Sequence, residues 1–541
     1  MKVAPRILSL AAVLVWSAAL AACNGNNSSP PPTYTIGGTV VNLAGTTGGL
    51  ILQDNLTDNL TVITNGSFTF ATPIPSGGSY SVTIFAQPSN PPQTCGVTGG
   101  AGTANGNIVT VEVNCGHNEW TWAKGVNAVQ RKGVYGMLGI AAIENNPGGR
   151  QLPATWIDSS GNPWLFGGYG LDSAGGLFPM NDLWEYSNGE WTWMGGPNIG
   201  AQQGVYGSMG AAAASNIPGA RYGSASWTDK DGNFWLFGGN GFDSAGNEGY
   251  LNDLWKFSAG EWTWIGGSNV VMQPGSYGTL NVPDANNIPG ARFEAVTWVD
   301  SSGDFWLFGG FGYDSTAHNG LLNDLWKYSG GQWTWVSGAI TNNQRGVYGS
   351  LGVPAAGNVP GGRTSASGWI DSSGSLWLFG GAAADSTGTQ GFENDLWRYS
   401  NGEWTWMSGS AVVNQLGVYG LRGMASATNI PGARQNSVSW IDPAGNLWLF
   451  GGNAISVPNA GLFNDLWKYS NGEWTWMSGS SSINPTGVYG TQGTPAPGNV
   501  PGGRLLSCGW VDLKGNFWLF GGYGYGPANE GDLDDLWMYL P

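Results

Sequence analysis

The sequence predicts an all-β fold in which six repeated units close into a ring behind a small β-sandwich. One phrase, Trp-Leu-Phe-Gly-Gly, recurs with its Trp at positions 164, 235, 306, 377, 448 and 518. A second phrase, Asp-Leu-Trp, follows each copy, with its Trp at positions 184, 255, 326, 397, 467 and 537. Charged residues make up only 10% of the chain, which carries 31 Trp. A fixed period of 71 or 70 residues in so aromatic a chain indicates a folded repeat architecture.

Each repeat divides into four short strands. In the second repeat we expect them at residues 221–229, 234–239, 253–257 and 261–264. The first-to-second and third-to-fourth connections are tight turns whose Asn-Gly and Asp-x-x-Gly sequences supply the positive φ that short hairpins need. Four antiparallel strands joined in this way predict one blade of a propeller.

The two ends of the array predict how the ring closes. Residues 119–122 repeat the fourth strand but have no earlier strands to pair with, and residues 534–539 repeat the third strand but have no fourth strand after them. Pairing the two segments would complete a sixth blade and remove the open sheet edge. Residues 117–541 are therefore predicted to form a six-bladed propeller closed by an N-terminal fourth strand.

The repeated features resemble the kelch motif. A double Gly ends the second strand, the third strand is aromatic, the fourth strand carries Trp, and an Arg opens the first strand. The resemblance spans residues 117–541 and implies the propeller type of kelch proteins and of the central domain of galactose oxidase. The units here are longer than a kelch repeat of ~50 residues.

The copper chemistry of galactose oxidase does not come with this resemblance. That enzyme uses two His and a Tyr cross-linked to a Cys, whereas this chain has only His117 before the array and His318 in a loop, and Cys508 lies in a strand. No His-rich zinc site, nucleophile elbow or phosphate loop is present. Four loops repeat Asp-Ser-[Ala/Thr], which supplies few oxygen ligands for Ca²⁺. We therefore expect no metal ion and no cofactor, and we identify no catalytic residue.

The long connections predict where a ligand binds. The second-to-third loops and the fourth-to-first loops emerge on the same side of an up-and-down blade, and only these loops are long. Long loops on a rigid scaffold usually carry binding. The second-to-third loops are the least repetitive, so specificity is expected in residues 169–180, 240–251, 311–322, 382–393, 453–463 and 523–533.

Two residue types recur once in each blade near this face. The candidate binding face consists of Arg150, Arg221, Arg292, Arg363, Arg434 and Arg504 with Tyr135, Tyr206, Tyr277, Tyr348, Tyr419 and Tyr489. The alternative for the Arg set is a structural ion pair with the Asp that opens each third strand. The alternative for the Tyr set is loop anchoring. The Trp residues after the signal segment all occupy repeated positions, which favours packing between sheets over ligand contact.

Residues 1–22 are typical of a bacterial lipoprotein signal peptide. Lys2 and Arg6 precede an apolar run that ends in Leu-Ala-Ala-Cys, which resembles the lipobox in which the Cys, here Cys23, is lipidated. The alternative is a secretory peptide cut near Ala22 that leaves a free thiol. Residues 23–33 are then expected to be a flexible tether.

Residues 34–116 have no copy in the repeats. Short alternating apolar segments separated by Gly, Asn, Pro and Asp predict a small β-sandwich. The pattern resembles immunoglobulin-like or carboxypeptidase-regulatory-like modules. Cys95 and Cys115 bracket its last part, and we expect a disulfide between them in an oxidising compartment. A spacer role is expected, with a binding module as the alternative.

Charge and targeting together lead to a functional hypothesis. The net charge of −16, without a basic cluster after residue 6, argues against nucleic acid as a partner. We expect a monomeric protein of the bacterial cell envelope, lipid-anchored, whose propeller binds a protein or polysaccharide on its long-loop face. The membrane is contacted only through the lipid. The alternatives are a carbohydrate-active lyase, epimerase or hydrolase, and a structural protein that binds copies of itself.

Overall fold

The computed structural model describes residues 31–41, 43, 49–89, 95–115, 118–455, 459–496 and 498–541. The predictions for the signal peptide, for Cys23 and for His117 lie outside these residues. The chain divides into two compact units, Met1–Val113 and Asn114–Pro541. All regular elements of the described residues are β-strands. A helix with the length and hydropathy needed to traverse a bilayer is absent from this part of the chain.

The first unit is a sandwich of two four-stranded sheets. One sheet has the order β5 (Gly66–Thr69), β2 (Ile36–Val41), β10 (Ile108–Cys115), β8 (Cys95–Thr98). The other has the order β4 (Asp58–Val62), β3 (Leu50–Asp54), β7 (Ser79–Ala86), β9 (Ala101–Thr103). β1 (Thr33–Tyr34) pairs with β6 (Ile74–Pro75). The strands alternate as predicted, and Ile36, Leu50 and Val113 are fully buried between the sheets. Cys95 and Cys115 are joined by a disulfide.

The second unit contains six blades. Blade 1 consists of β12 (Arg150–Gln151), β13 (Ala154–Ile157), β14 (Pro163–Leu171), β15 (Leu177–Ser187) and β16 (Glu190–Gly195). Blade 2 consists of β17 (Arg221–Tyr222), β18 (Ala225–Thr228), β19 (Phe234–Phe242), β20 (Glu248–Ser258) and β21 (Glu261–Gly266). Blade 3 consists of β22 (Arg292–Phe293), β23 (Val296–Val299), β24 (Phe305–Phe308), β25 (Phe311–Tyr313), β26 (Asn319–Leu321), β27 (Leu325–Ser329) and β28 (Gln332–Ser337).

The remaining three blades follow the same plan. Blade 4 consists of β29 (Arg363–Thr364), β30 (Ser367–Ile370), β31 (Leu376–Ala384), β32 (Gln390–Ser400) and β33 (Glu403–Ser408). Blade 5 consists of β34 (Arg434–Gln435), β35 (Val438–Ile441), β36 (Leu447–Ile455), β37 (Ala460–Ser470) and β38 (Glu473–Ser478). Blade 6 consists of β39 (Arg504–Leu505), β40 (Cys508–Val511), β41 (Phe517–Phe520), β42 (Tyr523–Tyr525), β43 (Glu530–Asp532), β44 (Leu536–Leu540) and β11 (Glu119–Lys124).

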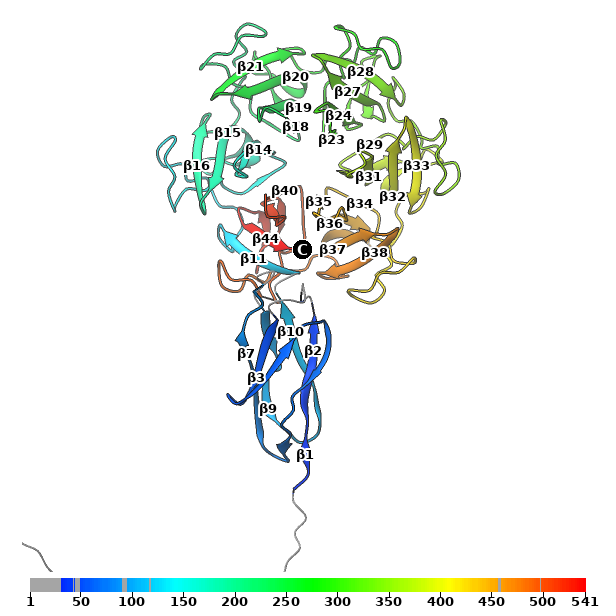
Figure 1. Cartoon of the computed structure of the whole chain (residues 1–541). Helices are drawn as coiled ribbons and strands as arrows, with labels where there is room; N and C mark the ends of the chain where they lie inside the picture. The colour runs from blue at the N-terminus through cyan, green and yellow to red at the C-terminus, as the bar shows by residue number, and fades with distance from the viewer. Residues whose placement is uncertain are drawn as a thin grey trace, which may run out of the picture. The chain divides into compact units, whose positions relative to one another are not determined.

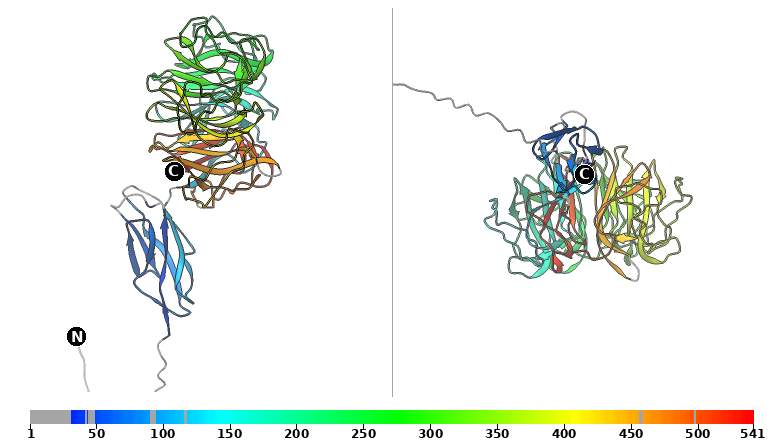
Figure 2. Two further views of the ribbon diagram at one scale, coloured as in Figure 1. Left: turned by 90° about the vertical axis from the view of Figure 1, so that its right-hand side faces the viewer. Right: turned by 90° about the horizontal axis from the view of Figure 1, so that it is seen from below.

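The blades are arranged in a ring, as Figure 1 shows in face view and Figure 2 from two further sides. Their innermost strands line a central channel. The innermost strands β13, β18, β23, β30, β35 and β40 each contact the next one, and β40 contacts β13 to complete the ring. Aromatic side chains fill the space between neighbouring sheets. For example, Trp156 of blade 1 stacks on Phe234 of blade 2 with ring centroids 5.2 Å apart. The repeated Trp positions therefore pack between blades, as their periodicity predicted.

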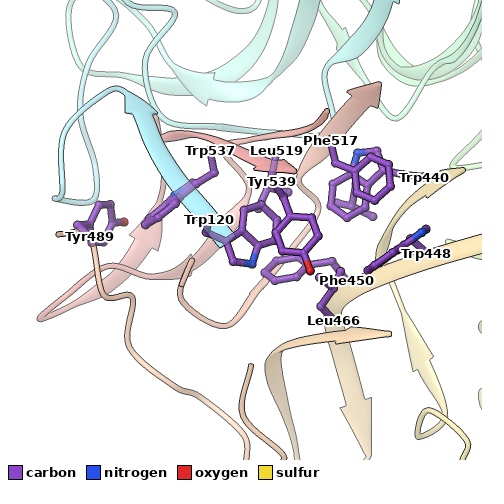
Figure 3. Packing of buried hydrophobic residues seen from close by; sticks show 11 residues of the cluster. Trp120, Trp440, Trp448, Phe450, Leu466, Tyr489, Phe517, Leu519, Trp537 and Tyr539 are labelled. Atoms are coloured by element: carbon purple, nitrogen blue, oxygen red, sulfur yellow. The ribbon is translucent and has the colours of Figure 1, made fainter. Parts of the chain in front are cut away.

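The predicted closure is present in blade 6. β11 runs antiparallel to β44, with Trp120 opposite Tyr539 and Trp122 opposite Trp537. The side chain of Trp120 is only 1% exposed and lies among aromatic rings of blades 5 and 6, with its ring centroid 4.9 Å from that of Tyr539 (Figure 3). The first strand of the array thus supplies the outermost strand of the last blade, and it is held there by pairing and by packing.

The double Gly divides each blade into two tiers. Gly167 and Gly168 have φ of 63° and 96°, and the pairing of β14 with β15 shifts register between Phe166 and Gly168. A Cβ at Gly167 would lie 2.6 Å from the backbone O of Met180, so a side chain does not fit. Beyond the bulge, β14 and β15 continue as an upper tier. The expectation of dozen-residue loops between the second and third strands was therefore wrong, because most of those residues are strand and only a short turn joins them.

The fourth-to-first loops also differ from expectation. Ala142 of the loop before blade 1 forms a β-bridge with Trp191 of its outermost strand, and Asn145 Nδ2 donates to the Trp191 O at 3.0 Å. Equivalent bridges form in all the other blades. These loops therefore cover the outer sheet edge, which would otherwise present unpaired backbone groups. The long segments do not all lie on one face of the disc.

Candidate functional site

The repeated Arg and Tyr meet one Asp inside each blade. In blade 2, Arg221 Nη1 and Nη2 donate to Asp253 Oδ1 and Oδ2 at 2.7 and 2.8 Å. Tyr206 OH and Trp255 Nε1 both donate to Asp253 Oδ2, at 2.6 and 2.7 Å. Arg221 Nε and Nη1 also donate to the backbone O of Gly219 and Gly238. The cluster thus joins the fourth-to-first loop, the double-Gly bulge and the third strand of one blade.

This cluster is present in all six blades, and its members are not on a binding face. The Arg side chains are at most 1% exposed, five of the six Tyr are buried, and Tyr419 is half-buried. Burial disfavours the guanidinium charge, but the carboxylate outweighs it and raises the pKa of Arg221. The prediction that the Arg and Tyr sets form a binding face is therefore wrong, and the alternatives, an ion pair for each Arg and loop anchoring for each Tyr, are found instead. The pairs are Arg150–Asp182, Arg221–Asp253, Arg292–Asp324, Arg363–Asp395, Arg434–Asp465 and Arg504–Asp535.

The other residues weighed in the sequence also have local partners. The first Asp of the Asp-Ser-[Ala/Thr] turns caps the turn, as where Asp172 Oδ1 accepts the N–H groups of Ala174 and Gly176 at 2.9 and 2.8 Å. His318 is exposed, with Nδ1 2.9 Å from Thr316 Oγ1. Burial raises the pKa of the Cys508 thiol to about 12. In the described part of the chain, no group of three or more His, Cys, Asp or Glu is placed to hold a metal ion.

A ring of six residues surrounds one mouth of the channel, and no repeated motif in the sequence marks it. Each residue lies two positions after the repeated Arg and has a φ between 49° and 64°. At five of the six junctions between blades, the backbone N–H of the ring residue donates to the backbone O of the equivalent residue in the preceding blade, at 2.8–3.1 Å. Such left-handed backbone is uncommon outside Gly and gathers at functional sites. The mouth ring consists of Leu152, Gly223, Glu294, Ser365, Asn436 and Leu506.

Polar side chains occupy one half of the mouth ring. The Glu294 carboxylate of blade 3 accepts a hydrogen bond from Ser365 Oγ of blade 4 and one from Asn436 Nδ2 of blade 5, the latter at 3.3 Å. Both bonds end on Oε2. Burial raises the pKa of Glu294, although these donors partly oppose the shift. The other half of the ring presents Leu506, Leu152 and Gly223. The ring lines a cavity of about 160 Å³.

Half-exposed aromatic side chains lie beside the mouth ring. Tyr222 and Phe293 immediately precede two ring residues, and their ring centroids are 6.3 Å apart. Phe293 stacks on Tyr250 at 5.1 Å with an interplanar angle of 18°. Further ring contacts continue the group across the upper tiers of blades 1 to 3. We call this group the aromatic strip: Tyr169, Tyr222, Tyr250, Phe293, Phe311 and Tyr313.

The aromatic strip departs from the repeat. Where blades 2 and 3 carry Tyr222 and Phe293, blades 4 and 5 carry Thr364 and Gln435. The framework therefore does not require aromatic rings at these positions. A comparison of equivalent positions, blade by blade, is the sequence signal that would have found both the strip and Glu294. The Trp positions carry no such signal, because they are invariant among the blades.

Two buried acidic residues also break the repeat. Glu393 stands where blades 2 and 3 carry Leu251 and Leu322, and its Oε2 has no hydrogen-bond partner among the residues that the structure describes. Burial and the adjacent charge of Asp395 raise the pKa of Glu393 to about 9. Asp534 replaces the Asn of the other blades, and burial together with the charge of Asp535 raises its pKa to about 7. Both carboxyls lie inside their blades rather than at the channel mouth.

Comparisons with known proteins do not identify a family. No family model and no curated protein matches the sequence. The solved structure of YjhT aligns with 72% of this chain and 94% of its own, at 15% identity and a TM-score of 0.42. A fungal alcohol oxidase of the AA5 family, solved in complex with copper, aligns with 75% of this chain and 77% of its own, at 14% identity and a TM-score of 0.39. The fold assignment rests on strand order and closure, and these likenesses carry no inference about activity.

The Arg–Asp cluster predicts a large stability effect. Asp253→Asn removes the negative partner of a buried guanidinium, which costs about 3–5 kcal/mol in buried ion pairs. We expect a loss of that order in the free energy of unfolding, measured by chemical denaturation followed by Trp fluorescence. Asp231→Asn is the control, because Asp231 is exposed in a turn of the same blade, and its change stays within about 0.5 kcal/mol. Equal effects of the two substitutions would contradict a structural role for the cluster.

Glu393 predicts a pH dependence of stability. In the unfolded chain its carboxyl ionises near its ordinary pKa of 4.5, whereas in the folded protein it stays protonated up to about pH 9. Folding therefore opposes ionisation, and stability falls as pH rises between these values. Glu393→Leu, which copies blades 2 and 3, should remove this decline and be more stable than wild type at alkaline pH in denaturation curves. An unchanged slope, as expected for the exposed control Glu248→Leu, would show that Glu393 ionises freely.

Proposed function

We propose that this protein is a lipid-anchored component of the bacterial cell envelope whose propeller binds a polysaccharide on the face that carries the mouth ring and the aromatic strip. The observation that carries the proposal is the aromatic strip beside the mouth ring. Its six side chains are half-exposed, and the repeat does not require them. Half-exposed aromatic rings without a framework role favour ligand contact.

The chemistry of the strip suits a sugar chain. Tyr rings offer an apolar face for the C–H face of a sugar and a hydroxyl for its polar edge. The strip extends over three adjacent blades, so several sugar units would lie side by side on it. Small-molecule sites combine such apolar surface with a few polar groups, and the mouth ring supplies Glu294, Ser365 and Asn436 at the edge of the strip.

Binding is better supported here than hydrolysis. Glycoside hydrolysis ordinarily needs two carboxyl groups on either side of the scissile bond. Among the six positions of the mouth ring, Glu294 is the only carboxylate. The lyase, epimerase or hydrolase alternative would therefore need a second acidic group brought in from elsewhere on the face.

The location of the protein is proposed from its N-terminus. The apolar segment ending in Leu-Ala-Ala-Cys supports lipidation of Cys23, with residues 23–33 as the tether. The β-sandwich would then act as a spacer between the lipid and the propeller. The propeller would contact the membrane only through the lipid and would act as a monomer.

A binding screen tests the polysaccharide proposal. Full-length protein is titrated with a panel of soluble bacterial and plant polysaccharides by calorimetry. We expect at least one polysaccharide to bind. Phe293→Ala should raise its Kd about tenfold, which corresponds to a loss of ~1.4 kcal/mol in the free energy of binding. Tyr523→Ala, a half-exposed residue of the same face in blade 6, should have little effect. Recovery of a protein partner alone, with no glycan bound, would favour the protein-binding alternative instead.

Mass spectrometry of the mature protein tests the anchor. We expect cleavage before Cys23 and a mass increment on that residue equal to its lipid. Cys23→Ser should release the protein from the membrane fraction into the soluble fraction. An unmodified Cys23 in the mature chain would exclude the anchor without affecting the glycan proposal.

A further inference from the structure

We propose that the mouth ring receives a protonated amino group, so that the polysaccharide bound on the aromatic strip contains amino sugars without an N-acetyl group. This inference rests on the proposed function, because it names the ligand class of the same face. It depends on three features of the ring: its single charge, its division into a polar and an apolar half, and the place of the aromatic rings beside it.

The ring has one ionisable side chain, and it is acidic. Of the residues that line the cavity, Glu294 alone can carry a charge. The six nearby Arg do not compensate it, because each guanidinium is buried in a bidentate pair with its own Asp. The ring therefore offers a net negative site, which attracts a cation and repels the carboxylate of an acidic sugar.

The side chain of Glu294 is held toward the centre of the ring. It extends from blade 3 to donors on blades 4 and 5, and both of these donors, Ser365 Oγ and Asn436 Nδ2, bond to Oε2. Oε1 receives neither of them. An ammonium group has three donors and would form a charge-assisted hydrogen bond to Oε1, which is stronger than a bond to a neutral hydroxyl. The same contact would offset the desolvation cost of the charged Glu294 carboxylate, which raises the pKa of this group.

The remaining surroundings fit a sugar that carries this amine. Gly223 lets the ring pack closely around Glu294, because a Cβ there would lie only 3.3 Å from Glu294 Cγ and 3.3 Å from Phe293 Cδ2, which is tighter than an ordinary contact. Phe293 and Tyr222 border the ring, and aromatic faces attract an ammonium ion. The cavity of about 160 Å³ is smaller than the ~300–1,000 Å³ of whole ligand sites. It therefore holds one group of the ligand, while the rest lies on the strip.

The test compares two ligands that differ only in acetylation. Full-length protein is titrated by calorimetry with a fully deacetylated chitin oligosaccharide and with its N-acetylated counterpart, at a pH where the free amine is protonated. We expect the deacetylated oligosaccharide to bind about tenfold more tightly. Glu294→Gln should abolish this preference. Glu530→Gln, which removes an exposed charge from the same face in blade 6, should retain it.

A second variant tests whether a loss of preference comes from the missing carboxylate rather than from misfolding. Glu294→Asn introduces the residue that blade 5 carries at the same left-handed position, so the backbone accepts it, and it too should lose the preference. Equal binding of the two oligosaccharides by wild type, or a preference that survives both Glu294 variants, would overturn the inference while leaving the polysaccharide proposal standing. If neither oligosaccharide nor any other glycan binds, the proposed function fails as well.

Discussion

The buried Arg–Asp pair is the interaction on which each blade depends. Its guanidinium bonds to the backbone at the double-Gly bulge, while its carboxylate accepts the Tyr hydroxyl of the fourth-to-first loop and the indole of the third strand. One ion pair therefore fixes a loop, a bulge and a strand against one another. Because both charges are removed from water, the loss of either partner would leave an unpaired buried charge and destabilise the blade. Repetition of the pair gives all six blades the same internal contacts and the same upper tier.

This repetition of the same contacts makes departures from the repeat informative. A framework position has the same packing and the same partners in each blade, so its residue is constrained in the same way six times. Where the residue changes from blade to blade, the framework does not set it. Glu294 in the mouth ring and Phe293 in the aromatic strip change in this way and are accessible, whereas Glu393 changes but is fully buried. A residue that breaks the repeat is therefore a candidate for ligand contact only where its side chain is accessible, and a buried one reflects local packing in the core.

Much of the fold could be predicted from the sequence because it depends on local patterns repeated at a fixed spacing. The unpaired strand phrase around Trp120 and its missing partner after Tyr539 were enough to predict the closure of blade 6. The prediction of a loop around Tyr169 was wrong because the segment follows a double Gly, and a double Gly usually marks a turn. Here the two Gly form a bulge within a strand that continues beyond them. The loop around Ala142 showed no strand pattern, since it makes only an isolated bridge to the sheet edge.

The sequence by itself determined the number of blades, the closing strand and the β-sandwich, and it offered one Asp for each Arg only as the alternative to a binding role. These follow from periodicity and from charge balance within one repeat. Only the tertiary structure decided that the Arg and Tyr sets are interior, and that Glu294, Ser365 and Asn436 meet at one mouth of the channel. These three residues are separated by 71 positions each. Their contact arises because ring closure brings equivalent positions of different blades together around the axis, a proximity that no local pattern encodes.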